Sequence, residues 1–228
     1  MPQPGPNDNP YKKIGDLHNE AVIYVLRRLM EDNKNAKFQD TTQQKIVDYV
    51  AEFLQIIRND KDRILSAQEY AHITLFLRDL ETFDELLKTS AMHPEARAFI
   101  LEMLDVKEKT DREDLIKLRE IEQRILKSKL EDKDKKYPSL FAAVAIRSIE
   151  LAEDPEGEYR KQREVLNKVN KRFRWPWKKD AKAALIVPLK VALSGDPVIA
   201  LSVLGLAVGT GAAASLKEVI WPDKKNKQ

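Results

Sequence analysis

Few residues in this sequence have the types and spacing that metal or redox chemistry needs. The sequence has three histidines, His18, His72 and His93, and no cysteine. Glu69 and His72 have the Glu-x-x-His spacing that places two metal ligands on one face of a helix, but a di-iron bundle needs two such pairs and a glutamate from each of two further helices. Because only one such pair occurs, we expect neither a metal site nor another cofactor.

Nucleophilic and phosphate chemistry also lack their usual motifs. The absence of cysteine removes thiolate catalysis, and no Gly-x-Ser-x-Gly turn occurs. The glycine-rich run from Gly205 to Gly211 lacks both the lysine and the preceding strand of a phosphate-binding loop. The acidic residues are scattered at ion-pair spacings, so we predict no catalytic residues and no enzymatic activity.

A cluster of basic and aromatic residues begins at residue 171 and is the strongest candidate for a binding surface. Tryptophan and basic side chains are typical of membrane interfaces, where they meet anionic headgroups. The predicted membrane-interface residues are Arg172, Phe173, Arg174, Trp175, Trp177, Lys178, Lys179 and Trp221. Single-stranded nucleic acid could use the same stacking and charge, but an apolar segment follows and the net charge is only +3, so we do not expect a nucleic-acid partner.

An uncharged stretch of twenty residues, Pro197 to Leu216, lies inside these flanks. As a helix it would measure roughly 30 Å, the thickness of a bilayer's hydrocarbon core. Gly205, Gly209 and Ala213 repeat at four-residue steps, which predicts a helix-packing face. Two arrangements stay open: a single membrane-associated helix, or an αα-hairpin with the preceding apolar segment, which could be buried in a soluble bundle.

The elements that must position these residues are helices. Apolar residues recur at three- and four-residue steps from Asp16 onward, and Thr41, Ser66 and Thr82 each begin a capping-box signature. No alternating pattern typical of a strand occurs. The sequence therefore predicts an all-α protein, a multi-helix bundle of short capped helices with an apolar C-terminal helical hairpin or single membrane-associated helix.

Three patterns locate individual helices of the body. Pro94 suits the first position of a helix. Residues 111–133 are highly charged, with opposite charges such as Glu120 and Arg124 four residues apart, which favours a solvated outer helix over a coiled-coil partner. Residues 138–151 are apolar around most of a helical circumference, which predicts a central helix.

The opening of the first helix carries a resemblance. Leu17-His18-Asn19-Glu20-Ala21 resembles the start of a group of uncharacterised bacterial helical proteins that also share an Ala/Gly-rich end, although the end of this chain holds less glycine. The resemblance implies a bacterial origin and a non-catalytic role.

These patterns divide the chain into four parts: a disordered lead-in over 1–12, a charged helical-bundle domain over 13–174, an apolar C-terminal hairpin or membrane-associated segment over 175–222, and a basic tail over 223–228. We expect a non-enzymatic protein that associates with a membrane through the apolar segment and acts by protein–protein interaction. The alternatives are a membrane-perturbing effector or toxin, and a soluble all-α scaffold or regulatory protein with the hairpin buried. The denser basic cluster precedes the apolar segment, which predicts a cytoplasmic location at the inner face of a membrane.

Overall fold

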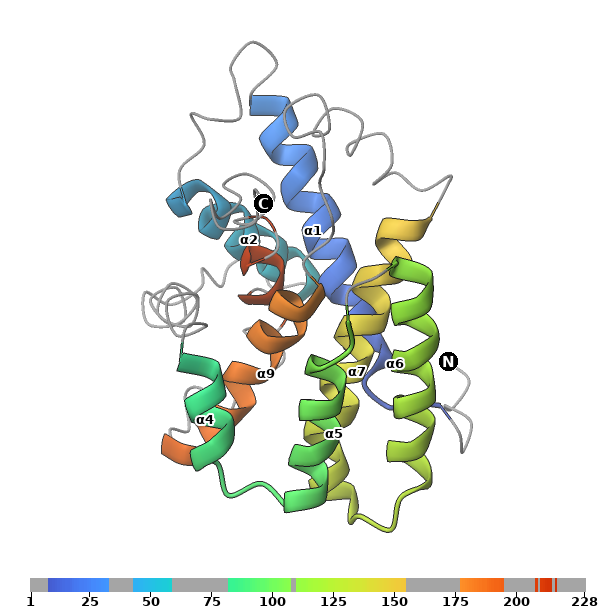
Figure 1. Cartoon of the computed structure of the whole chain (residues 1–228). Coiled ribbons are helices and arrows are strands. Elements are labelled where there is room, and N and C mark those ends of the chain that lie inside the picture. Colours follow the sequence, from blue (N-terminus) through green and yellow to red (C-terminus); the bar gives the residue numbers. More distant parts are fainter. Residues whose placement is uncertain are drawn as a thin grey trace, which may run out of the picture.

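The computed structural model describes residues 8–32, 43–58, 82–107, 110–154, 177–194, 208, 210–214 and 216. Over these ranges the protein is helical and has no strand, which confirms the predicted all-α fold. The helices with defined bounds are α1 (Lys12–Asp32), α2 (Gln43–Arg58), α4 (Phe83–Thr89), α5 (Pro94–Leu104), α6 (Asp111–Lys127), α7 (Asp132–Glu153) and α9 (Trp177–Ser194) (Figure 1). Residues 208, 210–214 and 216 are also helical.

Helix α7 is the centre of the bundle. It packs against α1, α5, α6 and α9, and Phe141 and Val144 have no exposed surface. This confirms the central helix predicted over 138–151. The helix nevertheless begins at Asp132, so Pro138 lies inside it. Proline has no N–H for the helical hydrogen bond, which is why the sequence alone predicts a helix that starts at this residue.

Helix α6 covers one side of α7 and ends earlier than predicted. Its last residue is Lys127, because Ser128 closes the helix: the Ser128 hydroxyl donates to the Ile125 carbonyl oxygen at 2.7 Å. The charges on α6 also pair differently from the prediction. Arg124 donates to both carboxylate oxygens of Glu102 on α5, at 2.6 and 3.0 Å. The charged face of α6 therefore ties neighbouring helices together.

Two of the described helices, α5 and α6, begin with a side-chain N-cap. Thr110 accepts the N–H of Glu113 at 3.1 Å, and His93 Nδ1 accepts the N–H of Glu95 at 3.3 Å, with Pro94 at the predicted first position. Thr82 precedes α4 but makes no side-chain cap hydrogen bond, with φ −101° and ψ 8°. The capping box predicted at Thr82 is therefore wrong, because an N-cap residue takes extended backbone angles. Those predicted at Thr41 and Ser66 start outside the described residues.

The N-terminal residues just before α1 are packed on the body. Asn9 is buried, and its side-chain amide donates to Glu122 at 2.6 Å and to the Ser139 carbonyl oxygen at 2.8 Å. Residues 8–12, within the predicted lead-in, are thus anchored to α6 and α7. Residues 1–7 lie outside the described ranges.

The described part of the apolar C-terminal segment belongs to the same core as the body. Helix α9 packs on α7 and α4, and in Figure 1 it lies between them. Ala213 and Leu216 are fully buried in the core cluster that α1 and α7 also form. No helix among the described residues combines the length and the apolar character needed to cross a membrane.

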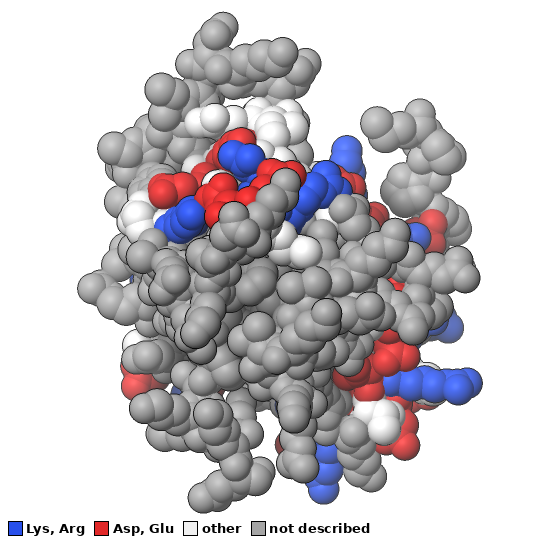
Figure 2. Space-filling view, turned by 90° about the horizontal axis from the view of Figure 1, so that it is seen from above, with Lys and Arg blue, Asp and Glu red and all other residues white. Residues whose placement is uncertain are grey.

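In Figure 2, which views the molecule from above, acidic and basic side chains lie next to one another among the coloured residues. Several such opposite charges form ion pairs in the structure. Between α1 and α2, for example, Lys45 Nζ lies 2.6 Å from Asp32 Oδ2, and Arg28 Nε lies 3.4 Å from Glu52 Oε2. Opposite charges that neutralise each other locally do not attract a polyanion in the way that a one-signed patch does.

Candidate functional site

The structure describes only some of the predicted membrane-interface residues. Trp177, Lys178 and Lys179 open α9, whereas Arg172, Phe173, Arg174, Trp175 and Trp221 lie outside the described residues. Trp177 has no exposed surface, and Lys178 Nζ lies 5.4 Å from the centroid of its ring. In this structure Trp177 is thus a core residue, and it could meet a membrane only after α9 leaves the core.

Of the three predicted helix-packing residues, the structure describes Ala213, which is fully buried. Gly205 and Gly209 lie outside the described residues. A different glycine makes the close approach. A Cβ on Gly211 would lie 2.8 Å from His18 Cδ2, a distance that real Cβ atoms essentially never show. The four-residue repeat did not single out Gly211, because the residue that faces it belongs to a helix at the other end of the chain.

His18 and Asp180 meet at this point. His18 comes from α1 and Asp180 from α9, both side chains are fully buried, and His18 Nε2 lies 3.9 Å from Asp180 Oδ2. The other ring nitrogen, Nδ1, lies 3.2 Å from Asn19 Oδ1, and Asn19 Nδ2 donates to the Arg147 carbonyl oxygen at 2.8 Å. We call His18, Asn19, Arg147, Asp180 and Gly211 the tail–body junction.

Buried polar atoms without hydrogen bonds occur both in the C-terminal segment and in the body. Within the described ranges, His18 Nε2, Ser148 Oγ, Trp177 Nε1 and Thr210 Oγ1 are buried and have no hydrogen-bond partner. Trp177 and Thr210 belong to the segment itself, and His18 and Ser148 to the body. An unsatisfied buried polar group costs about 1–3 kcal/mol. Apolar packing therefore stabilises the docked segment, and the unsatisfied polar groups destabilise it.

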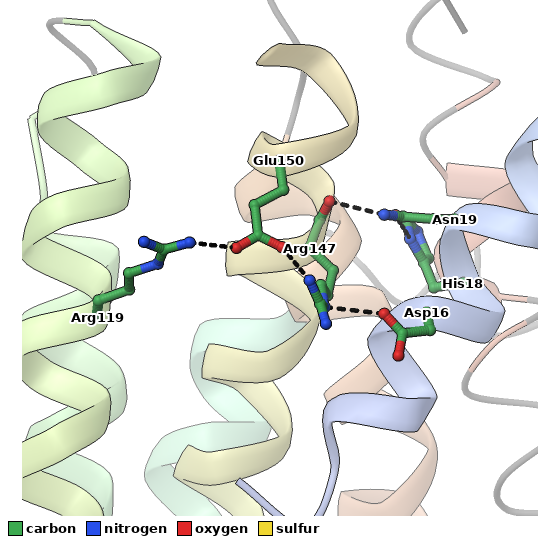
Figure 3. A network of polar contacts seen from close by, with 6 residues as sticks. All are labelled: Asp16, His18, Asn19, Arg119, Arg147 and Glu150. Atoms are coloured by element: carbon green, nitrogen blue, oxygen red, sulfur yellow. Dashed lines mark hydrogen bonds and ion pairs between the residues drawn. The ribbon is translucent and has the colours of Figure 1, made fainter. Parts of the chain in front are cut away.

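A network of ion pairs extends from Arg147, one of the junction residues (Figure 3). Arg147 Nε lies 2.8 Å from Asp16 Oδ1, and its guanidinium also pairs with Glu150. Arg119 from α6 donates to the other oxygen of Glu150 at 2.6 Å. The network joins α1, α7 and α6. None of the six side chains drawn in Figure 3 belongs to the C-terminal segment.

A polar pocket of about 280 Å³ opens beside this network and is lined by Asn9, Glu122, Arg119, Arg147 and Glu150, among others. Burial is the main cause that raises the pKa of Glu122, and the Asn9 hydrogen bond opposes it. A carboxyl with a raised pKa in a cleft is a candidate for acid–base work. The residues that line this pocket include no serine, cysteine or histidine that Glu122 could activate.

The tail–body junction is therefore the candidate functional site, because it brings two fully buried ionisable side chains, His18 and Asp180, close together. No group of three or more His, Cys, Asp or Glu side chains within the described ranges could hold a metal ion. Local sequence patterns could not reveal the junction, since 180 − 18 = 162 positions separate His18 from Asp180. No protein-family model, no curated protein and no solved structure matches the chain.

Proposed function

We propose that this protein is a non-enzymatic, conditional membrane-binding protein. It stores its apolar C-terminal segment inside the helical body and inserts that segment into a membrane after release. The observation that carries the proposal is the tail–body junction, where α9 and Gly211 pack on the body beside buried polar atoms that make no hydrogen bond.

Apolar burial alone does not decide between the docked and the membrane-bound state. Leu185, Ile186 and Leu189 of α9 are buried, and burying such a side chain stabilises by about 1.5–3 kcal/mol relative to water. A bilayer offers these side chains an environment as apolar as the protein core. Transfer from the core to a lipid phase therefore changes their free energy little.

The polar groups of the segment favour the membrane surface. In the core the Trp177 indole N–H has no described partner, whereas at a membrane interface it can donate to water or headgroups. Lys178 and Lys179 are partly exposed beside it, and each basic residue near an anionic surface contributes about 1 kcal/mol of attraction. These contributions support release toward an anionic membrane.

The rest of the body has contacts of its own. α7 packs on α1, α5 and α6 independently of α9, and the Arg119–Glu150 and Arg147–Asp16 pairs join these helices. Release of α9 would nevertheless uncover the part of α7 that α9 covers. An uncovered apolar helix face is a surface for a protein partner, which supports action by protein–protein interaction.

A reversible covalent lock tests the proposal. The chain has no cysteine, so cysteines introduced by His18→Cys and Gly211→Cys have only each other as disulfide partners within the chain. The first substitution removes the ring that a Cβ at position 211 would meet, and the nearest remaining atom, the Asp180 carbonyl oxygen, is 3.5 Å away. The oxidised protein keeps the segment docked, and the same protein after reduction is the matched control.

The readout is flotation with vesicles of anionic or zwitterionic lipid. We expect the reduced protein and the Gly211→Cys single variant to float with anionic vesicles, and the oxidised protein to remain unbound. Equal flotation of the oxidised and reduced proteins would show that binding does not use the segment. No flotation of either form would sink the membrane proposal.

The second candidate function is a soluble all-α scaffold or regulatory protein. It is supported by one observation: Trp177, Ala213 and Leu216 are fully buried in the common core, as an integral part of a bundle would be. This candidate predicts that neither form of the locked protein floats, and that Leu216→Asp unfolds the body as well as the segment.

A further inference from the structure

The polar pocket beside Arg147 lies between the residues that lead into α1, α6 and α7. Its described lining includes Asp8, Asn9 and Lys12, and none of it belongs to α9 or to the described residues that follow α9. The pocket measures about 280 Å³, just below the range of about 300–1,000 Å³ that is typical of sites for drug-sized ligands and cofactors. At about 30 Å³ for each water-sized atom, it has room for roughly nine non-hydrogen atoms. Its size therefore suits a small metabolite.

Two guanidinium groups line this pocket together and share one carboxylate (Figure 3). Arg119 from α6 donates to Glu150 Oε1 at 2.6 Å, and Arg147 from α7 pairs with the other oxygen, Oε2. Arg147 also reaches Asp16 through Nε, at 2.8 Å. A guanidinium has five N–H donors, so both arginines keep donors that no described contact uses. Guanidinium groups held in this way are suited to bind a carboxylate.

Glu122 lines the same pocket and has no ion pair among the described contacts. Asn9 donates to Glu122 Oε1 at 2.6 Å, which fixes the orientation of the carboxyl group, and no described hydrogen bond reaches Oε2. Burial is the main cause that raises the pKa of Glu122, whereas the charges of Arg119 and Arg147 oppose this effect as smaller causes. The charged form of Glu122 is thus incompletely compensated, and a cation in contact with Oε2 would stabilise it.

The balance of charges around the pocket decides which class of ligand it can take. Three of the described lining residues are basic and three are acidic. A simple anion would gain the guanidinium donors but would add negative charge beside Glu122 and Glu150. A simple cation would pair with Glu122 but would add positive charge beside the two arginines. Because like charges at close range disfavour binding, a molecule with one group of each sign fits this lining best.

The walls of the pocket set the distance between those two groups. Arg119 and Glu122 are three residues apart on α6, so they are neighbours on one face of the helix and are offset by about 4.5 Å along its axis. Ala143 and Ile146 of α7 also line the pocket, and their side chains have no polar group to bind a hydroxyl or an amide. A short methylene chain between the two charged groups suits this wall.

We propose that this pocket binds a small zwitterion, an amino acid whose ammonium group contacts Glu122 and whose carboxylate contacts Arg119 and Arg147. Binding without catalysis is expected, because the described lining includes no serine, cysteine or histidine. The site stands apart from the proposed membrane function, since it uses no described residue of the C-terminal segment and shares only Arg147 with the tail–body junction.

Isothermal titration calorimetry of the full chain at neutral pH tests the site with a series of ω-amino acids. Glycine, β-alanine, γ-aminobutyrate and δ-aminovalerate carry the same two charged groups on progressively longer chains. The matched controls for each are the molecule without its amino group and the molecule without its carboxylate, such as butyrate and propylamine for γ-aminobutyrate. We expect at least one zwitterion to bind with Kd below about 1 mM, and its two one-charge controls to bind at least about tenfold more weakly.

Two substitutions separate the two halves of the site. Glu122→Gln removes the charge that faces the ammonium group and keeps the shape of the side chain, and Arg119→Ala removes one guanidinium from an exposed side chain. We expect each to weaken zwitterion binding by about tenfold or more while helical circular dichroism is retained. The matched controls are Glu120→Gln and Arg112→Ala, at exposed positions of α6 outside the described lining. Both controls are expected to bind like the parent.

The possible outcomes separate this site from membrane binding. No binding of any zwitterion at about 10 mM, equal binding of a zwitterion and its one-charge controls, or full affinity in folded Glu122→Gln overturns the site, whatever vesicles do. Zwitterion binding that both substitutions weaken, in a protein that never floats with vesicles, supports the site and overturns the membrane function. Flotation of a protein that binds no zwitterion supports the membrane function and overturns the site.

Discussion

Replacement of Gly15 by alanine gives a quantitative test of the packing between α1 and α7. Alanine normally stabilises a helix interior by about 1 kcal/mol relative to glycine. At this position the new Cβ would lie 2.6 Å from the Ala143 carbonyl oxygen and 2.6 Å from Arg147 Cγ. The Arg147 side chain can rotate away, but the main-chain oxygen of α7 cannot, so α1 itself must move.

The size of the effect follows from the required displacement. Ordinary contact begins near 3.4 Å, so the helices must separate by up to 3.4 − 2.6 = 0.8 Å. A gap of that size forfeits about a quarter to a half of the dispersion energy of each facing contact. Overpacking of this kind costs about 1–3 kcal/mol, and contact with a main-chain atom favours the upper end. Subtracting the helix-propensity gain leaves a net loss of about 2 kcal/mol.

Urea and thermal unfolding provide the assay. We expect Gly15→Ala to lower the urea midpoint without a change in slope, and to lower Tm by roughly 4–8 °C for a protein of this size. Glu20→Ala, at an exposed position of the same helix, is the matched control and should be close to neutral. If Gly15→Ala is as stable as the parent or more stable, the close approach of α1 and α7 is refuted.

Two further predictions concern titrating groups. Burial raises the pKa of Glu122, so the folded protein disfavours its charged form; Glu122→Gln should therefore be more stable than the parent at neutral pH, and this advantage should vanish below about pH 4. Urea unfolding at several pH values measures this, and an advantage that does not depend on pH would contradict it. Burial, followed by hydrogen bonds with Glu52 and Asp32 respectively, raises the pKa of Tyr24 and of Tyr49 to about 12. Because an unfolded tyrosine ionises near pH 10, stability should fall between about pH 10 and about pH 12; the double variant Tyr24→Phe/Tyr49→Phe should lose much of this fall in circular dichroism, and identical alkaline transitions would argue against the assignment.

Local periodicity predicted the helices whose apolar residues face one direction. The steps of three and four residues from Leu17 gave α1, and the nearly continuous apolar run gave the central helix α7. The ends of α6 and α7 were predicted less well. The charges that continue past Lys127 concealed the end that Ser128 makes, and Pro138, which usually marks a helix start, lies inside α7.

The junction could not be predicted, because its parts carry no local signal. His18 is one apolar-face position of α1, and Asp180 is one charge in a basic region. They form a pair only because α1 and the C-terminal segment dock on the same core. Gly211 has a role for the same reason: close packing against His18 depends on tertiary structure and not on the spacing of glycines.

The central position of α7 also has a consequence for biosynthesis. α7 is complete when synthesis reaches Glu153, but its partner α9 ends at Ser194. The ribosome must add 194 − 153 = 41 residues in between, which takes about 2–8 s at bacterial and eukaryotic elongation rates. Throughout that interval the growing chain presents an apolar helix face without its cover, and it is then an aggregation-prone client for molecular chaperones.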